Sequence, residues 1–166
     1  MKHSITVTRS RRGLGWPEAC RFVRRAVRAA LDAEGVSEPC TVDVTFTDDE
    51  QIREINRQFR KVDAATDVLS FPLCELMPGQ FDPGECGWDP DSETIPLGDI
   101  VISLEHCAAQ GEEFGHGFEH ELMYLSVHST LHLLGYDHVD EGAMKKQMRT
   151  REKFIMEKLE GAPEEP

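Results

Sequence analysis

The sequence of 166 residues has no stretch approaching the roughly 20 consecutive apolar residues that a membrane-spanning helix needs. Its first residues also lack the apolar segment of a secretory signal peptide. We therefore expect a cytoplasmic protein with no membrane partner. A chain of this length can bury a core without disulfides, so we expect one domain over residues 1–160 and a frayed tail over 161–166.

Paired cysteine patterns are also missing. The five cysteines are odd in number, and no two have the C-x2-C spacing of zinc-binding or redox motifs. The cysteines therefore indicate neither a zinc site nor a disulfide framework. We therefore predict five reduced thiols: Cys20, Cys40, Cys74, Cys86 and Cys107.

Positive charge is absent from the middle of the chain. Residues 62–143 contain 17 Asp and Glu and no Lys or Arg, and the net charge of the whole chain is −13. An acidic protein of this kind is unsuited to loose nucleic-acid binding, although a local cationic groove can still bind phosphates. Arg21, Arg24, Arg25 and Arg28 form a basic stripe that predicts either a solvated helix face or a surface that positions a nucleic acid.

Hydrophobic periodicity predicts an α+β fold. Apolar alternation or short apolar runs predict strands at residues 4–9, 41–47, 67–71 and 98–103. Helical spacing predicts helices at 17–35, from a cap at Asp48, at 104–110, at 118–134 and from 144 onward. This order favours a small mixed sheet of about four strands packed with several helices. Residues 73–96 are predicted to be an acidic surface insertion, which we interpret as an unconstrained loop rather than a lid.

Three histidines have the spacing of ligands to one zinc ion. His128 and His132 are four residues apart, so they share one face of a helix. Gly135 can end that helix in the left-handed conformation and bring His138 towards the same ion. Three neutral imidazoles leave one tetrahedral position for water, as is typical of hydrolytic zinc enzymes. We therefore predict one Zn²⁺ per chain on an HxxxHxxxxxH motif.

The same spacing occurs in metzincin proteases, which carry a glutamate directly after the first histidine as general base. Ser129 has that position here, so metal-dependent hydrolysis is favoured over proteolysis, and a metzincin-like zinc peptidase is an alternative. The segment His116-Gly-Phe-Glu-His120 also fits a zinc pattern, H-x-x-E-H. We rank it lower because its glycines disfavour a helix and no third ligand follows at a defined spacing.

Three separated segments resemble the YbeY (UPF0054) family of metal-dependent hydrolases. They are Asn56-Arg-Gln-Phe-Arg60 leading to Thr66-Asp-Val-Leu-Ser-Phe-Pro72, Leu97-Gly-Asp-Ile-Val-Ile-Ser103, and the segment from His128 to His138. The resemblance implies a single-strand-directed endoribonuclease that matures the 3′ end of small-subunit rRNA and acts in ribosome quality control. The implied partners are rRNA and the ribosomal small subunit or its assembly factors. The oligomeric state is not indicated.

The resemblance also implies roles for individual residues: His128, His132 and His138 as zinc ligands, and Arg60 as a catalytic, substrate-binding residue. A guanidinium can hold a phosphoryl group by two hydrogen bonds. The alternative is a helix-end arginine that only interacts favourably with the helix dipole. No sequence rule identifies the general base. Asp67 and Asp137 are candidates, each with an ordinary alternative as a strand-end or turn carboxylate.

Two features depart from the family pattern. Residues 73–96 look longer than usual, and Ser129 replaces the usual glycine. Ser129 is therefore a candidate substrate-binding residue, which either crowds the approach beside His128 or donates a hydrogen bond to a phosphate. A third functional class is a non-enzymatic ribosome-assembly factor whose zinc is structural.

Overall fold

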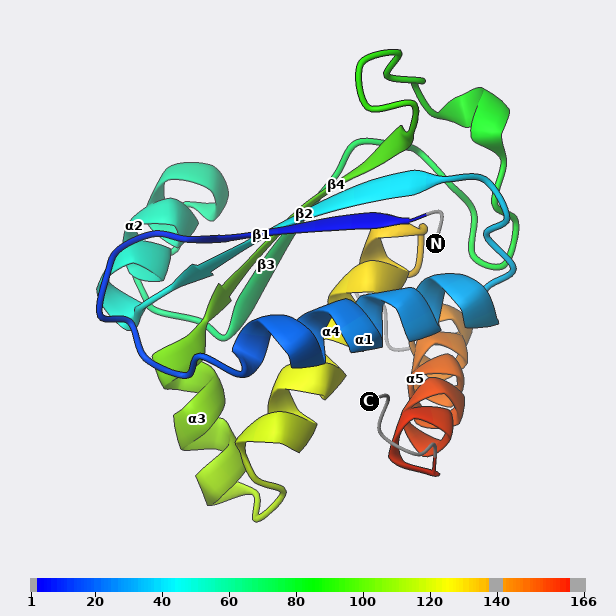
Figure 1. Cartoon of the computed structure of the whole chain (residues 1–166). Helices are drawn as coiled ribbons and strands as arrows, with labels where there is room; N and C mark the ends of the chain where they lie inside the picture. Colours follow the sequence, from blue (N-terminus) through cyan, green and yellow to red (C-terminus); the bar gives the residue numbers. More distant parts are fainter. Residues whose placement is uncertain (1–2, 138–141, 162–166) are drawn as a thin grey trace.

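The computed structural model describes residues 3–137 and 142–161, and a four-stranded mixed sheet forms its centre (Figure 1). The spatial order is β1-β2-β4-β3, with β1, β2 and β4 parallel and β3 antiparallel to β4. The strands are β1 (Ser4–Arg9), β2 (Cys40–Thr47), β3 (Val68–Pro72) and β4 (Ile95–Ser103). The helices are α1 (Ala19–Ala33), α2 (Asp49–Arg60), α3 (Leu104–Glu113), α4 (Phe118–Leu133) and α5 (Ala143–Gly161), with a short 3-10 helix at Pro83–Glu85. The predicted α+β class is confirmed.

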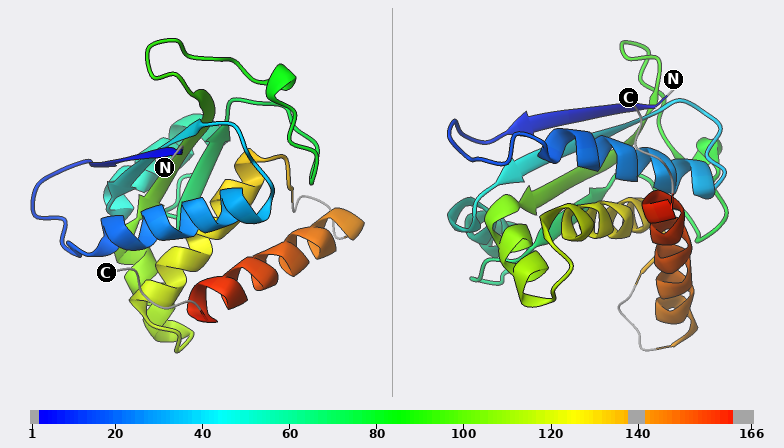
Figure 2. Two further views of the ribbon diagram at one scale, coloured as in Figure 1. Left: turned by 45° about the vertical axis from the view of Figure 1, so that its right-hand side comes forward. Right: turned by 60° about the horizontal axis from the view of Figure 1, so that its bottom comes forward.

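Helices pack on both faces of the sheet, but unequally. In Figures 1 and 2, α1, α4 and α5 lie together on one side of the sheet. Val44 and Ile100 on that face join the main core with Val27 of α1. On the opposite face, Ile52 of α2 packs with Leu69 of β3 and its neighbour Val101. Edge strand β3 therefore lies between α2 on one face and α4 on the other.

Helix α4 is buried on most of its sides because it is apolar almost all round. It packs against α1, α3, α5, β3 and β4, so its rotation and depth are fixed by five neighbours. The positions of His128 and His132 are consequently set by the most constrained helix of the domain. Among residues 3–137 and 142–161, no helix has the combination of length and hydropathy required to cross a bilayer.

Three strands have boundaries that differ from the prediction; for β2 the difference is one residue, because it begins at Cys40. Strand β4 begins at Ile95 rather than residue 98, because Ile95 and Pro96 pair with the start of β2. Strand β3 extends to Pro72, which an edge strand tolerates because one side of its backbone needs no ladder hydrogen bonds. The predicted insertion therefore ends at residue 94.

The insertion is tied to the core at several points. Cys74 and Cys86 form a disulfide, with their Cα atoms 5.1 Å apart, so the prediction of five reduced thiols was wrong for this pair. Cys20, Cys40 and Cys107 are free. Leu76 is buried against the main core, so the interpretation as an unconstrained loop was also wrong. The two cysteines are 12 positions apart in a turn-rich segment, and no local sequence pattern indicates that they come together.

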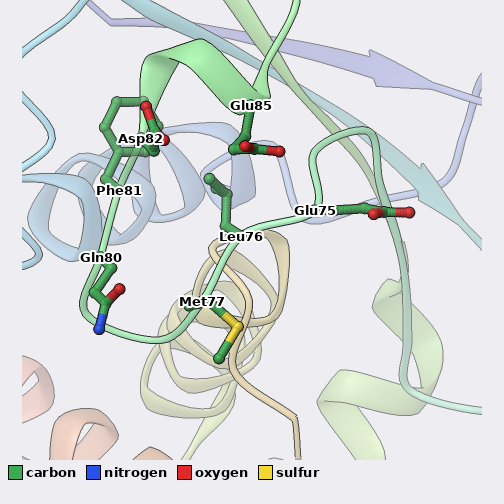
Figure 3. A pocket seen from close by; sticks show the side chains of 7 residues that line it. All are labelled: Glu75, Leu76, Met77, Gln80, Phe81, Asp82 and Glu85. Atoms are coloured by element: carbon green, nitrogen blue, oxygen red, sulfur yellow. The ribbon is translucent and has the colours of Figure 1, made fainter.

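A small pocket of about 390 Å³ lies within the insertion (Figure 3). Glu75, Asp82 and Glu85 contribute carboxylates to its lining, and none of the described residues that line it is cationic. This pocket is therefore electrostatically unsuited to phosphate. Figure 3 shows Leu76 and Met77 near the coil that follows α4.

The basic stripe of α1 is partly used inside the fold. Arg24 Nε donates to the carbonyl of Ile5 at 3.1 Å, and Arg25 donates to the carbonyl of Leu159 at 2.7 Å. These guanidinium groups tie α1 to β1 and α5. The stripe is therefore not a simple solvated face, and at least two of its members have structural partners.

Candidate active site

A cleft of about 710 Å³ follows edge strand β3. The end of α2, strand β3 with the residues before it, α4 and the coil after α4 all contribute to it. The lining residues are Phe59, Arg60, Thr66, Asp67, Val68, Leu69, Ser70, Phe71, Tyr124, Leu125, His128, His132 and Asp137. The structure thus brings Arg60, both candidate carboxylates and two of the three predicted zinc ligands to one cleft.

His128 and His132 each have Nδ1 in a hydrogen bond with a side chain from another element. Nδ1 of His128 lies 2.5 Å from Oε2 of Glu152, and Nδ1 of His132 lies 3.0 Å from Oγ of Ser70. A carboxylate accepts hydrogen bonds, so Nδ1 of His128 carries the proton and Nε2 is the nitrogen suited to a metal. Histidines that bind metals typically have such supporting partners, which orient the ring. The described pair therefore fits a metal ion that imidazole nitrogens can bind.

Glu152 is the supporting residue that the sequence analysis missed. It lies on α5, is 5% exposed, and accepts a second hydrogen bond from Tyr124 Oη at 3.1 Å. Burial and the Glu152 carboxylate raise the pKa of Tyr124, so its phenol stays protonated and donates. One sequence signal was present: Glu152 interrupts the apolar stripe of α5 formed by Met148, Ile155 and Leu159.

The coil that leads to the third predicted ligand is tightly held. Gly135 has φ +104°, and a Cβ there would lie 2.3 Å from the carbonyl oxygen of Leu76. The next residue, Tyr136, donates through Oη to Glu34 at 2.5 Å, and Arg151 holds the other oxygen of Glu34 at 2.7 Å. The chain is therefore fixed up to Asp137, which lines the cleft.

His138 lies outside the described residues, so its role as third ligand stays a prediction. Within residues 3–137 and 142–161, no group of three possible ligands converges on one point. The second pattern, His116 to His120, also has no third ligand within these ranges. The rings of His116 and His120 stack with their centroids 4.5 Å apart, and His120 pairs with Glu160 at 3.0 Å. His116 precedes α4 rather than lying on it, in agreement with the low rank of that pattern.

Arg60 occupies the last turn of α2 with its side chain exposed. The helix ends because Lys61 adopts the left-handed conformation, and Asn56 donates to the carbonyl of Ala64 at 2.9 Å to hold the returning chain. Neighbouring Arg53 and Arg57 pair with carboxylates. Within the part of the chain that the structure describes, the Arg60 guanidinium has no such partner. It is therefore available to an anionic ligand.

The two candidate carboxylates differ in how they are held. Asp67 Oδ1 accepts from the backbone N–H of Val68 at 2.7 Å, and Oδ2 accepts from Gln110 Nε2 at 3.2 Å. These bonds fix the Asp67 carboxylate at the cleft wall. Asp137 is partly buried beside the histidine helix. Both remain candidates for the general base.

Ser129 is placed differently from the other predicted site residues. It is fully buried, does not line the cleft, and its Oγ has no hydrogen-bond partner among the described residues. Since it follows His128 on a helix, its side chain points about 100° away from that histidine. The structure therefore does not bring Ser129 to the substrate position predicted for it.

Glu121 gives a prediction that concerns stability. It is buried on α4 and accepts from Gln110 at 3.2 Å, and its pKa is raised because burial and the nearby Asp67 carboxylate disfavour its charge. A raised pKa means that the stability from the protonated form is lost as pH rises through that pKa. We expect Glu121→Gln to raise the free energy of unfolding by about 1 kcal/mol at pH 7.5.

Urea unfolding at pH 7.5 and at pH 4 measures this effect. The gain of the glutamine variant over wild type should shrink at pH 4, where the Glu121 carboxyl of the wild type is mostly protonated in both the folded and the unfolded chain. A gain of equal size at both pH values would show that charge is not its cause. Replacement of exposed Glu157 by Gln, on α5, is the control for a general charge effect.

An α+β domain in which a supported histidine pair and an unpaired arginine share one cleft has the features of a metal-dependent hydrolase for phosphate-containing substrates. The sequence profile described as Endoribonuclease YbeY matches residues 5–160. The chain therefore belongs to the YbeY family of endoribonucleases.

Individual relatives agree with this assignment. The chain is 49% identical over 138 residues to Endoribonuclease YbeY of Caldanaerobacter subterraneus subsp. tengcongensis, covering 83% of this chain and 85% of that protein. It is 44% identical over 144 residues to Endoribonuclease YbeY of Clostridium kluyveri, covering 83% and 87%. The solution structure of TM1509 from Thermotoga maritima is similar, with a TM-score of 0.61 and 26% identity, over 95% of this chain and 89% of that chain.

Proposed function

We propose that this protein is a zinc-dependent endoribonuclease that cuts single-stranded rRNA, acting on the 3′ end of small-subunit rRNA and in ribosome quality control. The observation that carries the proposal is the single cleft lined by His128, His132 and Arg60. The proposal includes rRNA and the small subunit or its assembly factors as partners, and the cytoplasm as the location. Family membership supports the ribonuclease activity.

In this proposal His128, His132 and His138 hold the ion. A zinc ion bound by three imidazoles would polarise a phosphoryl oxygen and activate water for attack on phosphorus. The chain contributes the ring orientation: Glu152 and Ser70 engage Nδ1 of the two described histidines and direct Nε2 as the metal-binding nitrogen.

Arg60 would hold the phosphate. Cleavage of a phosphodiester increases negative charge on the phosphoryl oxygens, and a guanidinium can bind two of them at once. Among the described residues that line the cleft, Arg60 is the one Lys or Arg, while Asp67 and Asp137 carry negative charge. RNA affinity in a protein of net charge −13 would therefore depend strongly on this side chain.

Substitution of Arg60 tests the proposed function. We expect Arg60→Ala to lower kcat/KM for a single-stranded fragment of the rRNA 3′ end by roughly 100-fold, as expected when a charged contact to the transition state is lost. Arg60→Lys should recover only part of this loss, because an ammonium keeps the charge but lacks the two parallel N–H donors. The same fragment annealed to its complement should be cut poorly by all three proteins.

Arg57→Ala is the matched control, since Arg57 lies one turn earlier on α2, pairs with Glu54 and does not line the cleft. It should retain nearly full activity. Equal rates for wild type and Arg60→Ala would contradict the proposed phosphate contact. Cleavage of the duplex at the rate of the single strand would contradict the proposed substrate class.

The peptidase alternative is weakened by Ser129. That residue has the position of the metzincin glutamate, is not a carboxylate, and is buried away from the cleft. The assembly-factor alternative predicts a different result from the ribonuclease: RNA binding without cleavage by pure, metal-loaded protein.

A further inference from the structure

Phe59 is an exposed aromatic side chain at the candidate active site. It lies on the last turn of α2, directly before Arg60, lines the cleft and is 66% exposed. A phenyl ring that stays exposed does not contribute the stability that its burial would give. Isolated exposed apolar side chains are nevertheless common on protein surfaces. This ring differs from an ordinary exposed residue because it forms part of the cleft that contains the histidine pair.

A second aromatic ring supports Phe59 from the edge strand. The ring centroids of Phe59 and Phe71 lie 5.3 Å apart with an interplanar angle of 65°, an edge-to-face contact. Phe71 is partly buried and packs against the small core between α2 and the sheet. The end of α2 is held in turn by Asn56 and its bond to Ala64. Phe59 is therefore a positioned aromatic surface.

The neighbouring charge indicates which ligand fits this surface. Phe59 and Arg60 are adjacent in sequence and line the same cleft, so an apolar π surface and an unpaired guanidinium are presented together. A nucleotide carries the complementary pair of groups, a flat base and a phosphate. Aromatic side chains stack on bases with little regard to sequence, which is common in proteins that bind single strands.

We propose that Phe59, supported by Phe71, stacks on a nucleobase of the single-stranded RNA whose phosphate Arg60 binds. This inference rests on the proposed function and adds to it a cause for single-strand preference. A base in a duplex has its faces covered by neighbouring bases, so it cannot stack on Phe59 without first leaving the helix.

The test measures RNA binding separately from RNA cleavage. Metal-loaded wild type, Phe59→Ala and Phe59→Trp are titrated at 4 °C with an adenosine hexanucleotide and with a hexamer of abasic ribose phosphates of equal charge. The RNA is recovered afterwards to verify that it is intact. Phe114→Ala is the matched control, because Phe114 is 56% exposed but lies after α3, outside the cleft.

We expect Phe59→Ala to bind the adenosine hexamer roughly 5- to 150-fold more weakly than wild type, from the range for one stacked base. The two proteins should bind the abasic hexamer equally. Phe59→Trp should bind the adenosine hexamer at least as well as wild type, and Phe114→Ala should match wild type with both ligands. In cleavage assays Phe59→Ala should raise KM with kcat nearly unchanged, whereas a purely structural role would lower kcat.

Equal binding of the adenosine hexamer by wild type and Phe59→Ala would overturn the inference. So would an equal loss with the abasic hexamer, because that loss would not depend on a base. The proposed function fails separately, if metal-loaded wild type does not cleave RNA. In that case a base-dependent loss in Phe59→Ala would still identify the stacking site.

Discussion

Replacing His132 with alanine is expected to lower the rate of RNA cleavage by about 1,000-fold or more while the protein remains folded. The imidazole is one of three predicted ligands, and its loss would release or misplace the ion that activates water. The side chain lies at the cleft, where water can replace its hydrogen bond to Ser70. Wild type and variant are prepared identically, and their cleavage of single-stranded rRNA is measured together with bound zinc.

His106→Ala is the control, because His106 lies on α3, pairs with Asp49 at 3.3 Å and does not line the cleft. It should cleave RNA and bind zinc as wild type does. Equal cleavage by all three preparations would indicate a contaminating nuclease. If wild type holds one metal ion but none of the proteins cuts RNA, the hypothesis of a non-enzymatic assembly factor is favoured over that of a ribonuclease.

Removal of the metal with a chelator also distinguishes the ribonuclease from the assembly factor. A catalytic ion can be removed with loss of activity and only modest loss of stability, whereas a structural zinc contributes much of the folding free energy. We therefore expect the chelated protein to remain folded and to regain cleavage when zinc is returned. Imidazole ligands also accept nickel, copper or iron, so the recovery should be compared across these metals.

Gly135→Ala is expected to have the second large effect, a loss of roughly 3 to 5 kcal/mol in the free energy of unfolding. Two costs combine at this position. The backbone has φ +104°, which alanine adopts poorly, and a Cβ would lie 2.3 Å from the backbone oxygen of Leu76. The clash with Leu76 can be relieved only if the insertion moves away from the coil before His138. Zinc affinity should therefore fall together with stability.

Gly115→Ala isolates the first of these costs. Gly115 also has positive φ, +76°, but nothing lies within 4 Å of an added Cβ. We expect it to lose only about 1 kcal/mol and to keep its zinc. Urea unfolding and zinc titration of both variants measure the difference. Similar losses of stability in both variants would mean that the clash with Leu76 does not contribute to the free energy lost.

Local pattern was sufficient for most of the fold. Period-two alternation in β2 and the apolar stripe of α1 are properties of neighbouring residues, and the structure has both elements close to their predicted positions. The mixed sheet follows from the order of these elements. The disulfide of Cys74 and Cys86 did not follow, because its geometry depends on how an irregular loop returns to the core.

The candidate site divides in the same way. The spacing of His128 and His132 predicted a shared helix face, and both line one cleft on α4. Three features were not predicted: the Glu152 bond to His128, the Ser70 bond to His132, and the contact of Phe59 with Phe71. Each of them joins two different elements.

The sequence by itself determined the periodicity of each helix and strand, the four-residue spacing of the histidine pair and the glycine that ends their helix. Only the tertiary structure decided which side chains from other elements lie near the histidine pair. Glu152 of α5 and Ser70 of β3 form hydrogen bonds with the two imidazoles, and Arg60 of α2 lines the same cleft. The physical reason is range. Covalent geometry fixes the relation of residues within a turn or two, whereas a hydrogen bond across 24 or 62 residues forms only when the packing of whole elements brings its two atoms together.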